Sequence, residues 1–306
     1  TTHTAPTVPR RSSVRGPQPQ AFTAVAAHSP EAVGLNPDVR VCCLQLARRG
    51  SDESPWDSAQ RALACLTSVQ QSEKNVDLFV LPELCPFDSR QDTFTRYLPL
   101  SQEWQNLYER IDEAFCKKAR ELGVYIVYGM IGWHRRESDR SLRFTLKHKV
   151  VDRVGSYAAV YEKSYLSDLE FRFFEACPHK TATFFVDGFK FGLLVGDDLK
   201  YPNLARSLAR DKDVDVLLNP TASNTPRYIR KCRAVENAVY VLGAEYSDGA
   251  TIAVPPDPDH EAVGLESNAE EEEGYLLSRI QRPALQFART NFPYYRHMMT
   301  EPKGAA

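Results

Sequence analysis

Several features that define broad protein classes are absent from this sequence of 306 residues. No apolar run approaches the ~18–20 residues that a membrane-spanning helix needs, and the run at 214–218 has only the length of a strand. The 38 basic and 40 acidic side chains nearly cancel, to a formal charge of −2, so no general affinity for nucleic acid is indicated. An apolar content of 42% with 25% charged residues is typical of a globular domain with a large core.

Cysteine pairing is also absent. The seven cysteines are odd in number, and no CxxC or Cys/His pair has metal-ligand spacing, which argues against a disulfide framework or a zinc site. We therefore expect a reducing compartment, no metal and no cofactor. Several of these thiols lie in apolar runs and should pack as small apolar groups. They are Cys42, Cys43, Cys65, Cys85, Cys116, Cys177 and Cys232.

Acidic residues are missing from the start of the chain, where the first is Glu31. Residues 1–36 are instead rich in Pro, Ser, Thr and Arg, a composition that cannot bury enough apolar surface to fold alone. A disordered tail is one interpretation. The other is an extended arm that contacts another protein chain and remains after removal of an import signal, since organelle transit segments share this composition. The second interpretation predicts the mitochondrial matrix, with the cytoplasm as the alternative.

Residues 37–306 are predicted to form one globular domain. Helical and strand-like stretches alternate, and two hairpins are expected at 152–155 and 187–188. This order predicts an α/β domain with sheets inside and helices outside. Strands are expected at 39–47, 76–83, 124–133, 141–163 (two), 181–198 (two), 214–220, 240–247 and 275–280, and helices at 54–73, 101–123, 201–212 and 226–239.

The pattern degrades near the end of the chain. Residues 255–274 are Pro-rich and acidic, with four consecutive glutamates at 270–273. Such a segment is either a tolerated surface insertion or a surface that binds a basic partner. The tail, residues 289–302, reads as irregular.

Three local features could carry chemistry. Glu83 follows a buried strand in "FVLPELCPF", Lys163 follows a strand and is flanked by aromatic residues in "AAVYEKSYL", and a third, apolar strand ends at Gly196 in "FGLLVGDD". A carboxylate can move protons and an ammonium can stabilise an oxyanion. Each charged residue could equally be an ordinary surface side chain, because charged residues are mostly exposed.

These features, in this order, resemble the nitrilase or carbon–nitrogen hydrolase superfamily from about Val39 to Met299. The resemblance implies a four-layer α-β-β-α sandwich and a surface for homodimers. It also implies that Glu83 in "LPE" is the general base, that Lys163 in "YEKSYL" is the catalytic lysine, and that Glu175 in "FFEACP" supports this lysine. The segments "KCRAVENAVYVLGAEY" and "RTNFPYYRH" are similar to further parts of the family.

The sequence departs from the family at the nucleophile. The family has a cysteine where "FGLLVGDDLKYP" has Gly196, and glycine cannot form a covalent intermediate. Asp197 or Asp198 could replace it, although a carboxylate beside Glu83 would suffer repulsion that raises its pKa. Cys177 could lie near the pocket, but packing is its more ordinary role.

Three functions follow from this departure. The first is a catalytically inactive, structural or accessory subunit of a larger assembly, which binds other chains through residues 1–36 and the acidic loop 255–274 and in which Glu83, Lys163 and Glu175 are vestigial. The second is a carbon–nitrogen hydrolase with a nucleophile other than cysteine. The third is a sensor that binds a small amide. The sequence favours the first.

Overall fold

The structure is a computed structural model, and it describes residues 38–50, 52–98, 101–177, 181–222, 226–246, 251–253, 264–266 and 273–300. The predicted arm, residues 1–36, lies outside these ranges, as does most of the loop 255–274, so their contacts with other chains and a mitochondrial location stay predictions. Within the described ranges, no helix combines the length and apolar character needed to cross a bilayer.

The element order alternates strands and helices, as the sequence predicts. The strands are β1 (Asp38–Leu46), β2 (Leu78–Val80), β3 (Tyr125–Arg135), β4 (Leu142–Val151), β5 (Tyr157–Glu162), β6 (Thr183–Val186), β7 (Phe189–Leu193), β8 (Val216–Pro220), β9 (Tyr240–Tyr246), β10 (Thr251–Ala253), β11 (Gly264–Glu266) and β12 (Gly274–Gln281). The α-helices are α1 (Pro55–Glu73), α2 (Gln91–Tyr97), α3 (Gln102–Leu122), α4 (Pro202–Asp211), α5 (Arg227–Asn237), α6 (Arg282–Asn291) and α7 (Pro293–Thr300). Two short 3₁₀ turns are η1 (Glu170–Arg172) and η2 (Gly196–Lys200).

The two longest helices begin and end at residues suited to those positions. Ser54 caps α1 by accepting a hydrogen bond from the amide of Asp57 (3.2 Å), whose carboxylate accepts one from the amide of Ser54 in return. Such a capping box satisfies amide groups that the helix itself cannot pair. α3 ends at Gly123, whose φ of 66° is a left-handed conformation that glycine adopts without a steric penalty. Both boundaries confirm the sequence prediction.

The strands form two sheets that meet along one short seam. The path runs β5-β4-β3-β2-β1-β9-β8-β7-β6, with β12 on β1 and β10 on β9. The pairs β1–β2, β2–β3, β7–β8 and β8–β9 are parallel. β1 and β9 pair only through Gln45 with Glu245 and Leu46 with Tyr246, so this is the seam between the sheets.

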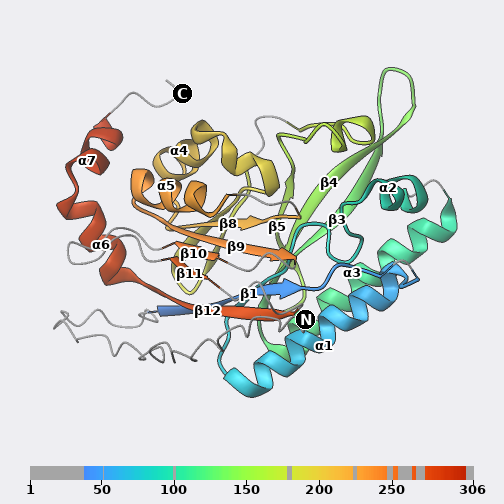
Figure 1. Cartoon of the computed structure of the whole chain (residues 1–306), viewed down its shortest axis with the longest axis horizontal. Coiled ribbons are helices and arrows are strands. Elements are labelled where there is room, and N and C mark those ends of the chain that lie inside the picture. Colours follow the sequence, from blue (N-terminus) through green and yellow to red (C-terminus); the bar gives the residue numbers. More distant parts are fainter. Residues whose placement is uncertain are drawn as a thin grey trace, which may run out of the picture. The chain divides into compact units, whose positions relative to one another are not determined.

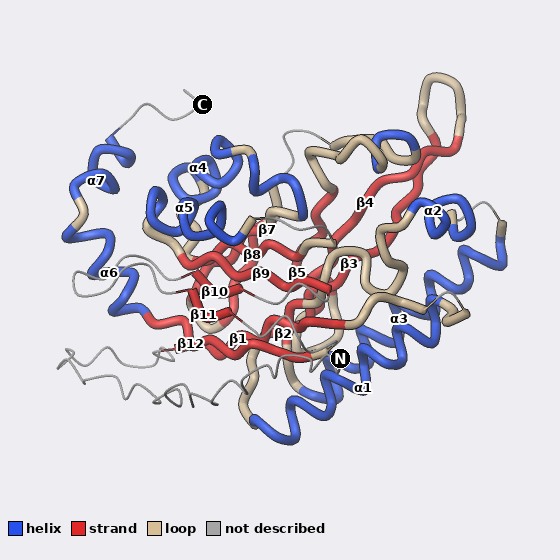
Figure 2. Tube along the Cα trace, viewed as in Figure 1, coloured by secondary structure: helices blue, strands red, loops and turns tan. Residues whose placement is uncertain are grey.

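Four layers, helix–sheet–sheet–helix, follow from how side chains alternate along the strands. In β1, Val39, Val41 and Cys43 face the second sheet, and they join a core with residues of β7, β8 and β9. Cys42, Leu44 and Leu46 face the other way and pack with residues of α1 and α3. A third core lies between the second sheet and the pair α4 and α5. Figures 1 and 2 show α1 and α3 on one side of the strands and α4 and α5 on the other, which confirms the predicted sandwich.

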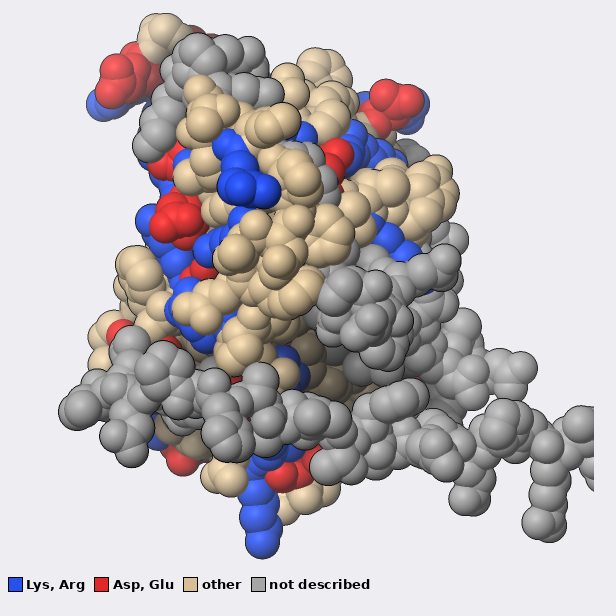
Figure 3. Space-filling model, turned by 90° about the vertical axis from the view of Figure 1, so that its left-hand side faces the viewer, with Lys and Arg blue, Asp and Glu red and all other residues tan. Residues whose placement is uncertain are grey.

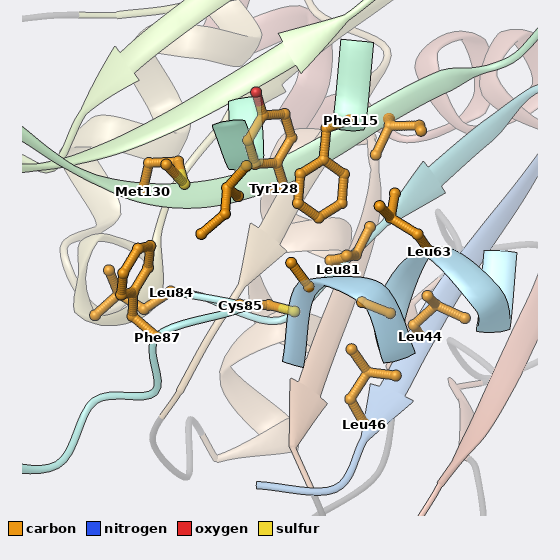
Figure 4. Packing of buried hydrophobic residues seen from close by; sticks show 14 of the residues in the cluster. Leu44, Leu46, Leu63, Leu81, Leu84, Cys85, Phe87, Phe115, Tyr128 and Met130 are labelled. Atoms are coloured by element: carbon orange, nitrogen blue, oxygen red, sulfur yellow. The ribbon is translucent and has the colours of Figure 1, made fainter. Parts of the chain in front are cut away.

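Figure 4 shows the outer core beneath α1 and α3, where Leu44, Leu63, Leu81 and Phe115 converge. The Cys85 thiol lies in the same core and is 2% exposed. Burial raises the pKa of this thiol to about 12, so it stays protonated and packs as an apolar group. Cys85 therefore confirms the packing role that the sequence predicts for buried cysteines.

The tail is not irregular, which corrects the sequence prediction. α6 and α7 occupy residues 282–300 apart from one residue between them. Asp215, just before β8, accepts hydrogen bonds from Arg282 and Arg289 of α6, each at 3.0 Å. These two ion pairs and the buried Leu285 hold α6 against the second sheet, a tertiary contact that local sequence patterns do not reveal.

Basic and acidic side chains are interspersed over the face that Figure 3 shows. This mixture fits the near-zero formal charge of the chain. The described part of this face therefore carries no large patch of one sign that would attract an oppositely charged polymer.

Replacing Phe115 with alanine should destabilise the protein by about 3–5 kcal/mol, because it removes a ring that is 0% exposed and stacks on Tyr128. Urea unfolding followed by circular dichroism would measure this change. Lys117→Ala on the same helix, at a side chain 78% exposed, is the control and should change stability by less than about 0.5 kcal/mol. Equal effects of the two substitutions would contradict the packing described.

Candidate active site

The candidate site lies where strands of both sheets end. Glu83 follows β2 and Lys163 follows β5, both in the first sheet. Gly196 follows β7 and Ala222 follows β8, both in the second sheet. The structure therefore brings together three of the predicted positions, Glu83, Lys163 and Gly196, from segments far apart in the chain.

The centre of the site is a buried lysine between two carboxylates. Lys163 Nζ donates to Glu83 Oε1 (2.8 Å) and to both carboxylate oxygens of Glu170 (2.8 and 2.9 Å). All three residues are less than 5% exposed. A buried charge is tolerated only when it is paired and hydrogen-bonded, and this ammonium meets that condition with three acceptors.

The electrostatics of the site favour a protonatable base beside a permanent cation. Burial raises the pKa of Glu83 to about 7, with a further increase from Glu170, and these effects outweigh the charge of Lys163, which lowers it. The pKa of Lys163 lies above its usual range because the attraction of both carboxylates exceeds the cost of burial. Glu83 can therefore change protonation state near neutral pH while Lys163 stays charged.

Glu170, and not Glu175, supports the lysine, which corrects the sequence prediction. Glu170 lies in η1, where the amide of Ser167 donates to its carboxylate (2.7 Å). The Glu175 side chain is 31% exposed and forms ion pairs with Arg136 and Arg143. The two glutamates are five residues apart in "DLEFRFFEACP", and only the turn of η1 decides which of them points inward.

Gly196 places bare backbone against this charged pair. A Cβ atom built on Gly196 would lie 2.6 Å from Glu83 Oε2 and 2.8 Å from Lys163 Nζ, closer than side chains approach such groups. Its φ of +52° is also a conformation that favours glycine. Glycine at this position thus allows the base and the cation to converge beside the end of β7.

The two aspartates that could replace the nucleophile are bound to other groups. Asp198 accepts hydrogen bonds from the Tyr161 hydroxyl (2.7 Å) and from the amides of Tyr165 (2.8 Å) and Val195 (3.1 Å). Burial raises the pKa of Asp198 to about 6. Asp197 forms an ion pair with Lys200 (2.8 Å). Both aspartates therefore serve the turn that follows β7.

Cys177 lies beside the lysine segment through its backbone. Its amide donates to the carbonyl of Lys163 (3.0 Å), and its carbonyl accepts from Ser164 Oγ (3.2 Å). These bonds place the Cys177 backbone next to the segment that carries Lys163, and the packing role that the sequence favours for its thiol stays a prediction.

A buried network that the sequence did not indicate fixes the Gly196 turn. Arg230 is 0% exposed, pairs with Glu245 and donates from Nε to Asn219 Oδ1 (3.1 Å). Asn219 Nδ2 in turn donates to the carbonyls of Leu194 (2.8 Å) and Gly196 (3.2 Å). Gly243 gives the guanidinium its space, because a Cβ there would lie 2.5 Å from Arg230 Cζ. The network ties β8, β9 and α5 to the backbone of the site.

Across the ranges that the structure describes, no group of three His, Cys, Asp or Glu residues is arranged to hold a metal ion. Glu83 and Lys163 supply a carboxylate that can accept a proton and an ammonium that can stabilise negative charge.

Comparison with known proteins identifies what this fold is similar to. The family model described as carbon–nitrogen hydrolase matches residues 40–290. A deaminated glutathione amidase from Rattus norvegicus is 25% identical, over 88% of this chain and 92% of that protein. A nitrilase from Pyrococcus abyssi is 29% identical, over 67% of this chain and 78% of that protein.

Two solved structures share the fold. Nit3 from Saccharomyces cerevisiae superimposes with a TM-score of 0.69 at 20% identity, covering 85% of this chain and 96% of that chain. An amidase from Nesterenkonia sp. superimposes with a TM-score of 0.67 at 20% identity, covering 83% and 95%.

The prediction of a catalytically inactive structural subunit is wrong. The relatives over most of the chain are amidases, and they support a hydrolase. That prediction rested on the missing side chain of Gly196, with residues 1–36 and the acidic loop 255–274 as further support. In the structure Glu83 and Lys163 come together beside that glycine, as the resemblance implied, and a second carboxylate, that of Glu170, also binds the lysine.

Replacing Arg230 with alanine should destabilise the protein by about 3–5 kcal/mol, because Glu245 would remain buried without its cation. Thermal and urea unfolding would measure the loss. The double variant Arg230→Met, Glu245→Leu should recover part of it, since an apolar pair leaves no unpaired charge. A single variant as stable as the original protein would show that the network contributes little.

Proposed function

Because the chain belongs to the carbon–nitrogen hydrolase family, we propose that it hydrolyses the C–N bond of an amide, with water in place of a cysteine as the nucleophile. The observation that carries this proposal is the convergence of Glu83 Oε2 and Lys163 Nζ on Gly196. A substrate carbonyl at this strand end would meet a base and a cation within hydrogen-bond reach of one another. The names of the amidase relatives support an amide as the substrate.

The reaction needs only two proton transfers. Glu83 takes a proton from a water molecule as the water oxygen attacks the amide carbon, and the carbonyl oxygen gains negative charge beside Lys163. The tetrahedral adduct then collapses and the C–N bond breaks. Glu83 returns its proton to the departing nitrogen, so the products are a carboxylic acid and ammonia or an amine, and Glu83 is regenerated.

Each charged residue has a separate role in this scheme. One ammonium against two carboxylates leaves the buried site with one negative charge, which a proton on Glu83 neutralises. Burial thus makes Glu83 a base that accepts a proton near neutral pH. Glu170 acts through Lys163 and is a positioning residue, because both of its carboxylate oxygens accept hydrogen bonds from the ammonium that also binds Glu83.

Water is favoured over the aspartates as nucleophile by the contacts of the turn. Asp198 Oδ1 and Oδ2 both accept hydrogen bonds that shape the 195–201 segment, so attack by this carboxylate would break the turn. Asp197 forms an ion pair with Lys200, which leaves its carboxylate less suited to attack a substrate.

The purified protein should release ammonia from simple amides, and Glu83→Gln and Lys163→Met should each lower kcat by about 10²–10³-fold because they remove the base or the oxyanion partner. Glu170→Gln should lower kcat less than these two substitutions, by about tenfold, because it acts only through Lys163. A coupled ammonia assay would measure all of these rates, with ion-exchange repurification to exclude a contaminating amidase.

Glu175→Gln is the matched control, since this carboxylate pairs with half-buried arginines and not with Lys163, and the substitution should leave the rate unchanged. Iodoacetamide treatment should also leave it unchanged if water attacks. Loss of activity on alkylation would instead implicate a thiol such as Cys177, and binding of amides without any turnover would overturn the hydrolase proposal.

The rate should rise with pH through about 7 and then level off. Glu83 acts as the base only when ionised, and its raised pKa moves that ionisation from the usual range of carboxylates to about neutral. A profile of kcat/KM between pH 5 and pH 9 measures this pKa in the free enzyme. A profile that is flat down to pH 5 would contradict Glu83 as the base.

A further inference from the structure

One buried histidine of the first sheet has no part in the reaction above. His148 of β4 is 0% exposed, and neither of its ring nitrogens has a hydrogen-bond partner among the described residues. It lies between Gly129 of β3 and Tyr161 of β5, and Tyr161 belongs to the core between the two sheets. Buried polar groups are nearly always hydrogen-bonded, so a ring that is kept without partners, at a cost in stability, indicates a function.

The ring lies close to the charged centre of the site. Its neighbour Tyr161 precedes Lys163 by two residues and donates from its hydroxyl to Asp198 (2.7 Å) in the turn after β7. Burial, and after it the nearby charge of Lys163, lowers the pKa of His148 to about 3. The imidazole is therefore neutral near pH 7, and a neutral imidazole has one N–H donor and one acceptor nitrogen.

A second group without a partner meets this ring at Gly129. A Cβ atom built on Gly129 would lie 2.8 Å from His148 Nε2 and 2.4 Å from the amide nitrogen of Leu84, so only glycine leaves them this space. The two nitrogen atoms are thus no more than about 5 Å apart, a gap that a small shift of the ring or one bridging water closes. Within the described part of the chain, the Leu84 amide donates to no other group.

Leu84 sets the direction in which the base leaves the sheet. It directly follows Glu83, and its φ of +55° is a left-handed conformation that is unfavourable for a residue with a side chain. The Leu84 side chain is 0% exposed in the outer core, and its carbonyl accepts from the amide of Asp88 (2.9 Å). The amide is therefore the remaining group of Leu84 through which this strained turn can be fixed.

We propose that His148 is a positioning residue for the base. Its neutral ring keeps the proton on Nδ1 and presents Nε2 as the acceptor for the Leu84 amide, which holds the turn after Glu83 and aims that carboxylate at Gly196. The inference rests on the proposed amidase activity and names the residue that keeps its base in place. Because Nδ1 donates to no described group, the ring lowers stability while it serves catalysis.

Three substitutions separate the acceptor from the bulk of the ring. Glutamine places an amide group where His148 has Nε2, asparagine places one where it has Nδ1, and methionine fills a similar space with only a weak acceptor. His148→Gln should keep kcat in the ammonia assay within about threefold of the original value. His148→Asn and His148→Met should lower kcat by about 10–100-fold with little change in KM, because a misplaced base slows the chemical step and not binding.

Thermal stability distinguishes positioning from packing. His148→Met should keep or raise the melting temperature, since it removes a buried ring nitrogen that has no partner. His134→Met is the matched control, at a histidine of the same sheet whose side chain is 47% exposed, and it should change neither kcat nor the melting temperature. Equal kcat values for His148→Gln and His148→Met would overturn the proposal.

Nuclear magnetic resonance separates this inference from the proposed reaction. In protein with isotopically labelled histidine and leucine, the His148 ring should be neutral between pH 5 and pH 8 with its proton on Nδ1. The Leu84 amide should exchange with solvent more slowly in the original protein and in His148→Gln than in His148→Met. A ring protonated on Nε2 would overturn the proposal.

The two failures are distinguishable. If no amide is hydrolysed but exchange at Leu84 depends on His148 in this way, the reaction fails and the contact stands. If amides are hydrolysed and neither kcat nor exchange at Leu84 depends on His148, the positioning role fails and the reaction stands.

Discussion

The ion pairs of Lys163 are the interaction on which the rest of the site depends. A lone ammonium at 3% exposure would be too costly to keep, and two carboxylates from separate segments offset that cost. Glu83 also accepts a hydrogen bond from the amide of Ala222 and so joins the first sheet to the second. The lysine therefore holds the ends of β2, β5 and β8 in one arrangement, which gives the site its geometry before any substrate binds.

Gly196 satisfies two constraints at once. The turn after β7 needs a left-handed backbone, and the approach of Glu83 and Lys163 leaves no space for a Cβ. Asn219 donates a hydrogen bond to the carbonyl of Gly196, and Arg230 donates one to Asn219. The surrounding side chains are thus adjusted to glycine, and the lack of a side chain at this position belongs to an ordered site and is not an isolated loss.

The layered fold could be predicted because each layer has a local signal. Alternating apolar residues in strands, and the helix boundaries at Ser54 and Gly123, can be recognised from residues that are close together in the sequence. Glu83 and Lys163 could be found because each follows a predicted strand and matches a motif of the family, although only the strand before Glu83 is buried. Glu170 could not be told from Glu175, since only the turn of η1 separates them in space. The partners of Arg230 come from β8 and β9, and no local pattern reports such contacts.

The charge of the buried site favours a neutral substrate. The group of Glu83, Lys163 and Glu170 carries one negative charge when all three side chains are ionised. Like charges repel strongly where water is excluded, so a carboxylate is disfavoured beside the base. A neutral amide meets no such penalty at Glu83, and the charge balance of the buried group therefore agrees with an uncharged C–N substrate.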